Sequence, residues 1–155
     1  MALSHHFVKT AYGFFYGTRA LLRHQIIESL TAPHTEKVAD AAIILWEQMA
    51  TQIIAIIGVG GFSSLYARSV FLSQSSFPWL AASALSLQAD TRFAELKKSL
   101  EGQAPADASE ANNRLLCTFT DILAALIGEA LTSSILRSAW GDHASAQTGK
   151  EFQIE

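Results

Sequence analysis

Residues 39–62 are the most hydrophobic segment of the chain, and they end in three closely spaced glycines, Gly58, Gly60 and Gly61. Apolar residues recur along the segment at steps of three and four, which is the spacing of one face of an α-helix. Glycines that follow such a run favour a helix end and a tight reversal of the chain. The pattern therefore predicts a long helix over residues 35–57 and a helix-to-helix corner at the glycines.

The same helical spacing continues along the rest of the chain, and no segment shows the sustained alternation of apolar and polar residues that marks a strand. A second long helix is predicted over residues 108–140, with Gly128 as a point where it can bend or approach another helix closely. Shorter helices are expected at residues 4–31, 63–73, 79–87 and 90–102.

These elements predict an all-α fold, a bundle of five to seven helices built on the two long ones. A chain of 155 residues is long enough to bury a core within one domain, which we assign to residues 1–141. Residues 142–155 are polar and rich in small side chains, so we expect them to form a flexible C-terminal tail.

Charged residues are scarce, at 16% of the chain against a usual share of about a quarter. Residues 41–87 contain only two of them, Glu47 and Arg68. This deficit indicates additional buried surface, either in a subunit interface or against a membrane. The net charge is -3 and the basic residues are scattered, so the clustered Lys and Arg that bind phosphate backbones are missing. No nucleic-acid partner is expected.

Aromatic residues gather after the glycines, in the part of the chain that is poorest in charge. A single layer of helices is too thin to bury all of them, and exposed aromatic patches mark interfaces. We therefore predict a non-enzymatic regulatory or protein-interaction module that works as a homo-oligomer, with a dimer favoured. A different protein is a second possible partner. The predicted interface residues are Phe62, Tyr66, Phe71, Phe77 and Trp79.

An alternative function is a small-molecule or haem sensor or carrier, in which apolar helices enclose the ligand. Haem needs an axial ligand such as His in an apolar pocket, and His24 near the aromatic residues Tyr12 and Tyr16 is the nominee. Apart from this alternative, no cofactor is predicted.

A second alternative is a membrane-associated helical hairpin, because residues 41–62 are long enough for a crossing, which needs about 20 residues. Glu47, Gln48 and Gln52 interrupt the segment, and a charge at bilayer depth costs about 2.5–3.5 kcal/mol on insertion scales. A buried soluble hairpin is favoured. The N-terminus does not resemble a secretory signal, so we expect a cytoplasmic location.

No pattern of residues predicts a catalytic or metal site. Cys117 is the only cysteine, which excludes an internal disulfide and clustered-thiolate metal sites, and its apolar surroundings favour a small buried thiol. The glycine cluster lacks the Gly-Lys-Ser/Thr of a phosphate-binding loop. The sequence also lacks the Glu-x-x-His motif of di-iron bundles.

Three carboxylates lie within apolar helical patterns: Glu47, Asp121 and Glu129. A carboxylate buried there would be paired or have a raised pKa, and such groups concentrate at functional sites. We expect instead that all three lie on outer, solvated faces of their helices. The basic residues considered as partners are Arg68, Arg114 and Arg137.

Overall fold

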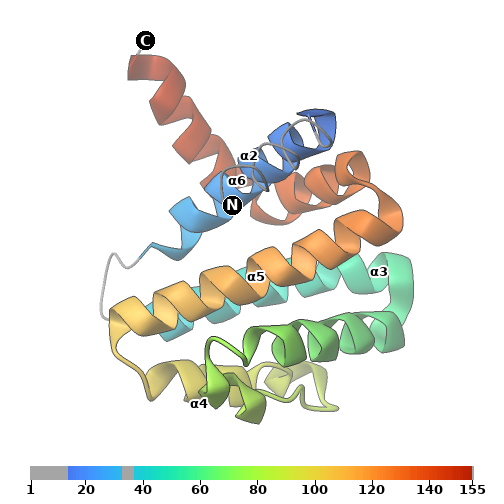
Figure 1. The fold of residues 1–155 in the computed structure, drawn as a ribbon, viewed down its shortest axis with the longest axis vertical. Coiled ribbons are helices and arrows are strands. Elements are labelled where there is room, and N and C mark those ends of the chain that lie inside the picture. Colours follow the sequence, from blue (N-terminus) through green and yellow to red (C-terminus); the bar gives the residue numbers. More distant parts are fainter. Residues whose placement is uncertain (1–13, 33–36, 155) are drawn as a thin grey trace, which may run out of the picture.

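The computed structural model describes the backbone of residues 14–32 and 37–154, and the side chains of residues 19–32 and 37–141. Within these ranges the chain forms α-helices and two short 3₁₀-helices and contains no strand, which confirms the all-α prediction (Figure 1). The elements are α2 (Phe14–Thr31), α3 (Val38–Ser73), η1 (Pro78–Ala82), η2 (Ala89–Thr91), α4 (Ala94–Glu101), α5 (Pro105–Ile127) and α6 (Glu129–Ile154).

Helices α3 and α5 form the centre of the bundle. Helix α3 folds back on itself at Gly58, so that its two halves run in opposite directions, and α5 lies along the first half (Figure 1). Helices α2 and α6 pack on one side of this pair, and α4 packs beside the second half of α3 on the other side. The two long predicted helices are thus the elements against which the others pack.

Both sharp corners of the bundle are made by a glycine at positive φ. Gly58 has φ 81° and ψ 166°, and Gly128 has φ 98° and ψ 150°. Side chains other than glycine rarely adopt these angles. The prediction of one continuous helix over residues 108–140 is therefore wrong: the chain breaks at Gly128 into α5 and α6. Helix α5 begins at Pro105, a residue suited to the first helical position.

The short helix predicted over residues 79–87 is also wrong, because only the 3₁₀-helix η1 forms there. Side-chain hydrogen bonds hold the following residue, Ser83, outside a helix. Its carbonyl oxygen accepts a bond of 2.8 Å from the buried Tyr66 hydroxyl, and its own hydroxyl donates to Ser99 at 2.9 Å. The helix predicted to begin at residue 90 begins later, as α4.

Residues 142–154, expected as a flexible tail, form helix that follows a kink of α6 at Trp140, where φ is -114° and ψ is 18°. Their flexibility stays a prediction, as does the assignment of a single domain to residues 1–141. The expected helix over residues 4–31 can be compared only from residue 14 on, where α2 occupies the described part.

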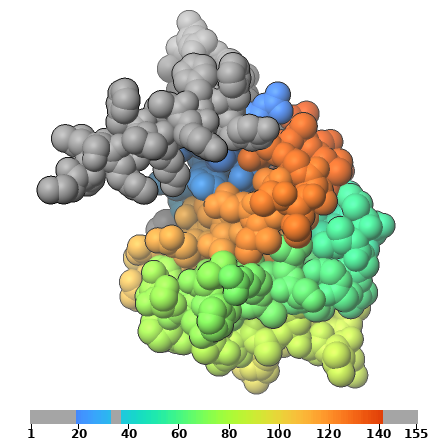
Figure 2. All heavy atoms as spheres, turned by 45° about the vertical axis from the view of Figure 1, so that its right-hand side comes forward, coloured from blue at the N-terminus to red at the C-terminus, as the bar shows by residue number. Residues whose placement is uncertain are grey.

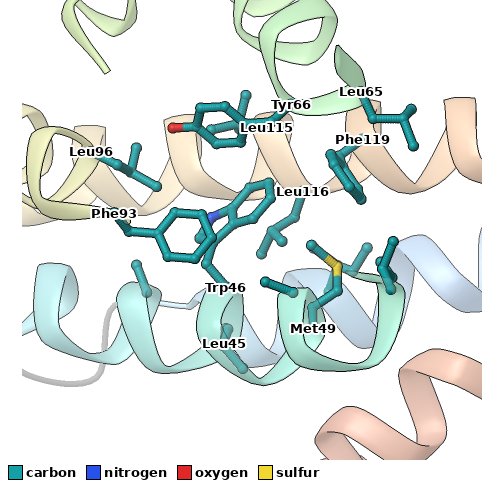
Figure 3. Packing of buried hydrophobic residues seen from close by; sticks show 14 of the residues in the cluster. Leu45, Trp46, Met49, Leu65, Tyr66, Phe93, Leu96, Leu115, Leu116 and Phe119 are labelled. Atoms are coloured by element: carbon teal, nitrogen blue, oxygen red, sulfur yellow. The ribbon is translucent and has the colours of Figure 1, made fainter. Parts of the chain in front are cut away.

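Trp46 lies at the centre of the core, surrounded by rings from three other segments (Figure 3). Its ring meets those of Tyr66 and Phe119 edge to face, each with centroids 5.4 Å apart, and that of Phe93 at 5.7 Å. Such pairs contribute about 0.5–1.5 kcal/mol each beyond the burial of their area. The indole nitrogen is satisfied as well, since Trp46 Nε1 donates to Asn112 Oδ1 at 2.8 Å. One tryptophan therefore ties both halves of α3 to α5 and to the start of α4.

Among the described residues, only α3 is long and apolar enough to cross a membrane by length and composition. Its best 18-residue window has a mean hydropathy of 1.7, and 33% of that window is buried in the bundle. The core helix of a soluble protein meets the same criterion, but most of such a helix is buried. The low burial of this window shows that α3 presents apolar surface outward.

Candidate functional site

The structure separates the five aromatic residues that were predicted to form an interface. Phe62 and Tyr66 are 1% and 2% exposed, and their rings stack with centroids 6.5 Å apart inside the core. Tyr66 points toward Trp46 in Figure 3. The prediction is wrong for these two residues, because Trp46, Phe93 and Phe119 from distant parts of the chain cover them.

The other three aromatic residues lie nearer the surface. Phe71 is 61% exposed, and the guanidinium carbon of Arg68 lies 5.8 Å from the centre of its ring. Phe77 and Trp79 are partly buried and pack edge to face with each other at 6.1 Å. Whether these residues meet a second subunit stays a prediction.

The three glycines singled out in the sequence have different roles. Gly58 makes the corner, whereas Gly60 and Gly61 lie in the second half of α3. A Cβ atom on Gly61 would lie 3.1 Å from the side chain of Ile57, so this glycine lets the chain pack closely across the corner. No atom lies within 4 Å of a Cβ position on Gly60.

An exposed apolar surface surrounds the two glycine corners, which lie at the same end of the bundle (Figure 1). Ile56 and Val59 flank Gly58 and are 52% and 58% exposed. Leu126 and Leu131 flank Gly128 and are 69% and 45% exposed. In Figure 2 the corner of α3 meets the corner between α5 and α6 on one face of the molecule. We call these four residues the corner patch.

The corner patch has no charged residue in the sequence around it apart from Glu129. None occurs from residue 48 to 67 or from residue 122 to 128. Glu129 itself has a side chain only 9% exposed and is paired within the protein. Small exposed residues surround the four aliphatic side chains, so another backbone can approach closely. They are Ala55, Gly60, Ala125 and Ala130.

Helical spacing alone predicts that Ile56, Leu126 and Leu131 lie on the inner faces of their helices, and the structure shows them exposed instead. Helical spacing assigns a face only while the helix continues, and both corners stop the helix within a few residues of these side chains. The signal that could have found the patch is the pair of uncharged stretches around Gly58 and Gly128.

A second feature lies next to the Gly128 corner and centres on Arg23 of α2. The Arg23 side chain is 3% exposed, and its Nε and Nη2 atoms donate to the two carboxylate oxygens of Glu129 at 2.8 and 3.0 Å. Its Nη1 atom donates to Thr120 Oγ1 at 2.7 Å and lies 2.8 Å from Asp121 Oδ1. His24 Nε2 lies 2.7 Å from the same Asp121 oxygen. We call these five residues the Arg23 cluster.

The charges of the Arg23 cluster depend on each other. Burial works against the charged form of Arg23, but hydrogen bonds and charges from Glu129 and Asp121 outweigh it and raise the pKa of Arg23. Burial likewise works against the Asp121 carboxylate, yet hydrogen bonds with His24 and Arg23 lower its pKa. The hydrogen bond from Arg23 is the largest influence on Glu129 and lowers its pKa against the opposing effect of burial. Removing one partner of a fully buried pair costs about 3–5 kcal/mol, and the part-buried Arg23–Glu129 pair lies below that range.

The Arg23 cluster joins α2 to the first residue of α6. Glu129 directly follows Gly128, and its negative charge also suits the N-terminus of a helix. At the other end of the described part of α6, Trp140 Nε1 donates to the carbonyl oxygen of Leu45 at 2.9 Å. All three guanidinium nitrogens of Arg23 bond within the protein, so the cluster is built to hold helices together.

The sequence pattern does not predict the Arg23 cluster. Helical spacing alone places Arg23 on the polar side of its helix and Glu129 on an outer face, but Arg23 is buried and the partly buried Glu129 is paired with it. Asp121 is half exposed, and Glu47 is exposed as expected. The partners of Arg23 are 97 and 106 residues away along the chain, so no local spacing could reveal the pairing.

The residues nominated for a ligand pocket are only partly described. Tyr12 and the side chain of Tyr16 lie outside the described residues. The Nε2 atom of His24 is engaged with Asp121, and that contact would have to break before the atom could bind a haem iron. Two cavities of about 70 and 250 Å³ border the start of α3, the larger one lined by Lys37 and Asp40 among others. The ligand hypothesis stays a prediction.

Cys117 is partly buried and its Sγ atom lies 3.9 Å from Asn113 Oδ1. Burial, with a smaller contribution from the charge of Asp121, raises the pKa of the thiol to about 11. Among the side chains that the structure describes, no three His, Cys, Asp or Glu groups come together in a way that could hold a metal ion.

Comparisons of this chain with protein-family models, with curated proteins and with solved structures find no match. The two features of the protein that bear on its function are therefore the corner patch and the Arg23 cluster.

Proposed function

We propose that this protein is a non-enzymatic interaction module that works as a homodimer, with the corner patch as its contact surface. The observation that supports the proposal most is the exposure of Ile56, Val59, Leu126 and Leu131 at one end of the bundle. Contiguous exposed apolar residues on a small domain mark interaction sites more often than scattered ones do.

A second copy of the chain suits this surface because both sides of a two-fold interface are the same patch. An uncharged patch can face itself without bringing like charges together, whereas a charged one cannot. The small residues around the four side chains let the two backbones approach closely. A patch of this composition is therefore complementary to itself.

The size of the patch sets the expected affinity. Covering the exposed half of one aliphatic side chain contributes about 1 kcal/mol, so eight such side chains in a symmetric dimer contribute about 8 kcal/mol. Association costs roughly 4–15 kcal/mol in lost freedom of motion, which this gain offsets only at the lower end. Dissociation at micromolar concentration corresponds to a net gain of about 8 kcal/mol, so close contacts of the neighbouring small residues must contribute at least about 4 kcal/mol more. With that contribution we expect a reversible dimer that dissociates at micromolar concentration.

The test is sedimentation velocity of the full chain over a range of concentrations, with one substitution inside the patch and a matched one outside it. Leu126→Glu places a charge in the interface and should weaken association at least tenfold. Leu87→Glu is the control, because Leu87 is fully exposed at 105% and lies outside the patch. A wild-type chain that stays monomeric at 100 μM or above, a concentration well beyond the expected micromolar range, would overturn the proposal, as would equal behaviour of the two variants.

Insertion of the same patch into a membrane surface is the second candidate function. It is favoured by the hydropathy of α3 and by the low burial of its most apolar window. Flotation with vesicles of neutral and anionic lipid separates the two candidates. Wild-type protein that floats while Leu126→Glu stays behind would favour the membrane, and wild-type protein that dimerises without floating would favour the second copy.

A further inference from the structure

We infer that the Arg23 cluster is a latch, by which the docking of α2 sets the angle of α6 at Gly128 and so assembles the corner patch. The inference deepens the proposed function and rests on it for its second half, the link to dimerisation. Three observations support it. The Cβ position of Gly128 is free of side-chain contacts, the pair between Arg23 and Glu129 bridges this glycine, and the corner patch has residues on both sides of it.

The hinge is Gly128. Its φ of 98° lies in the region open to glycine, and no atom lies within 4 Å of the Cβ position. Hydrogen bonds tie its backbone to Ala124 at 2.9 Å and to Thr132 at 3.1 Å, but no side chain packs against its Cβ position. The direction in which α6 leaves α5 is therefore set by contacts that α6 makes after the corner, the Glu129 pair and the buried Ile135 and Leu136 among them.

The contact nearest the hinge is the pair between Glu129 and Arg23. Two parallel hydrogen bonds of 2.8 and 3.0 Å fix the carboxylate in plane with the guanidinium, which defines an orientation as well as a distance. Thr120 and Asp121 of α5 bind the same guanidinium, so α2 holds the helices on either side of the hinge at once. Ser133, one turn along α6, donates to Glu129 at 3.4 Å and extends the contact.

The pair can be opened because little else ties α2 to the bundle by apolar packing. Ile27 is the one fully buried aliphatic side chain among the described residues of α2, while Leu21 and Leu22 are 61% and 55% exposed. The helix thus buries a charged side chain and exposes two leucines. Once Arg23 withdraws, the Glu129 carboxylate keeps only the long bond of 3.4 Å from Ser133, and turning at Gly128 is the way for it to reach water.

Opening the latch changes the corner patch directly. Leu126 belongs to α5 and Leu131 to α6, so they lie on opposite sides of Gly128. A turn of α6 about this glycine moves Leu131 away from Leu126 and from Val59 of α3. The four residues then no longer form one surface, and a dimer that depends on that surface must dissociate.

The test measures the hinge and the assembly separately in the full-length chain. Spin labels at exposed cysteines in place of Glu110 and Ser134, in a Cys117→Ala background, report the distance across Gly128. Ser134 is six residues beyond the hinge, roughly 9 Å along the helix, so a turn of about 30° moves it by about 5 Å. The distance is measured at a concentration at which the chain is monomeric, and association of the unlabelled chain is measured by sedimentation.

The variants are Arg23→Gln and the milder Glu129→Gln, which serves if the first fails to fold by circular dichroism. Asp40→Asn is the matched control, because it breaks an ion pair with Lys97 of 3.1 Å far from the hinge. We expect the latch variants to shift or broaden the distance by about 5 Å and to weaken association at least tenfold, with the control unchanged in both.

An unchanged distance in the latch variants would overturn the latch. A shifted distance with unchanged association would overturn its control of the patch. If the wild-type chain never associates, the proposed function fails, and the inference loses its second half with it, while the spin-label distances still decide whether Arg23 sets the hinge.

Discussion

The two glycine corners of this protein have nearly the same backbone geometry but are held in different ways. At Gly58, apolar packing holds both sides: Ile53 before the corner and Phe62 after it are each 1% exposed. At Gly128, Leu123 before the corner and Thr132 after it are each 0% exposed, and an ion pair between Glu129 and α2 adds a polar restraint. The two corners therefore have similar backbone angles, but only the Gly128 corner is also held by an ion pair.

Because the restraints differ, the two corners should respond differently to a single substitution. Apolar packing at Gly58 is spread over many contacts, and opening that corner would expose the core around Trp46. The restraint at Gly128 combines apolar packing with one guanidinium that binds residues on both sides of the corner, so withdrawing a single partner removes its polar part. We therefore expect the Gly128 corner to be more sensitive than the Gly58 corner to the loss of a single charged partner.

The largest expected effect is a loss of stability at the Gly58 corner. Phe62→Ala should lower the free energy of unfolding by about 3–5 kcal/mol, because it leaves a cavity beside Tyr66 and Phe119. The matched control is Phe71→Ala at a position 61% exposed, which should cost less than about 1 kcal/mol. Urea unfolding measures both. Similar losses in the two variants would mean that apolar packing does not hold the Gly58 corner.

The next effect compares the corners directly. Gly58→Ala and Gly128→Ala should each cost about 1–3 kcal/mol, since alanine is strained at these φ and ψ angles. Gly60→Ala should leave the free energy of unfolding unchanged or raise it by about 0.5 kcal/mol, because Gly60 is helical with open space at its Cβ position. Thermal and urea unfolding supply the values. A neutral substitution at either corner glycine would show that its turn can be made in another way.

Periodicity in the sequence is enough to predict the long helix before Gly58 and the corner at that residue. Three glycines within four residues mark a break strongly, whereas a single glycine inside a helical pattern is often tolerated. Gly128 was therefore read as a bend within one helix. What makes it a corner is the set of contacts that α6 makes with α2 and α3, and these contacts are not visible in local spacing.

The candidate site was less accessible from the sequence for the same reason. Whether Phe62 is buried depends on Phe93 and Phe119, which come from other helices. Whether Arg23 is buried depends on a carboxylate 106 residues away. Helical spacing assigns a side chain to a face of its own helix, and it does not say which other helix covers that face.

The smallest expected effect is the pH dependence of the free energy of unfolding, which tests the Gly128 corner. The pKa of Glu129 in the folded protein is lowered by the hydrogen bond from Arg23, so its carboxylate binds protons less readily than in the unfolded chain. The stabilisation this provides is complete above the unfolded value of about 4.3 and is lost as the pH falls through the lower folded value. The free energy of unfolding should therefore decrease below about pH 5, and Glu129→Gln should flatten that decrease.

Glu110→Gln, which removes an exposed carboxylate of α5, is the control and should leave the slope as it is in the wild type. Asp121 has the same sign of shift, so part of the slope should survive in Glu129→Gln. The effect is smaller than deletion of Arg23 because protonation removes the charge of Glu129 and keeps its hydrogen-bonding oxygens in place. Equal slopes in the wild type and Glu129→Gln would show that the charge of Glu129 is not what holds α6 to α2, and the two corners would then differ only in packing.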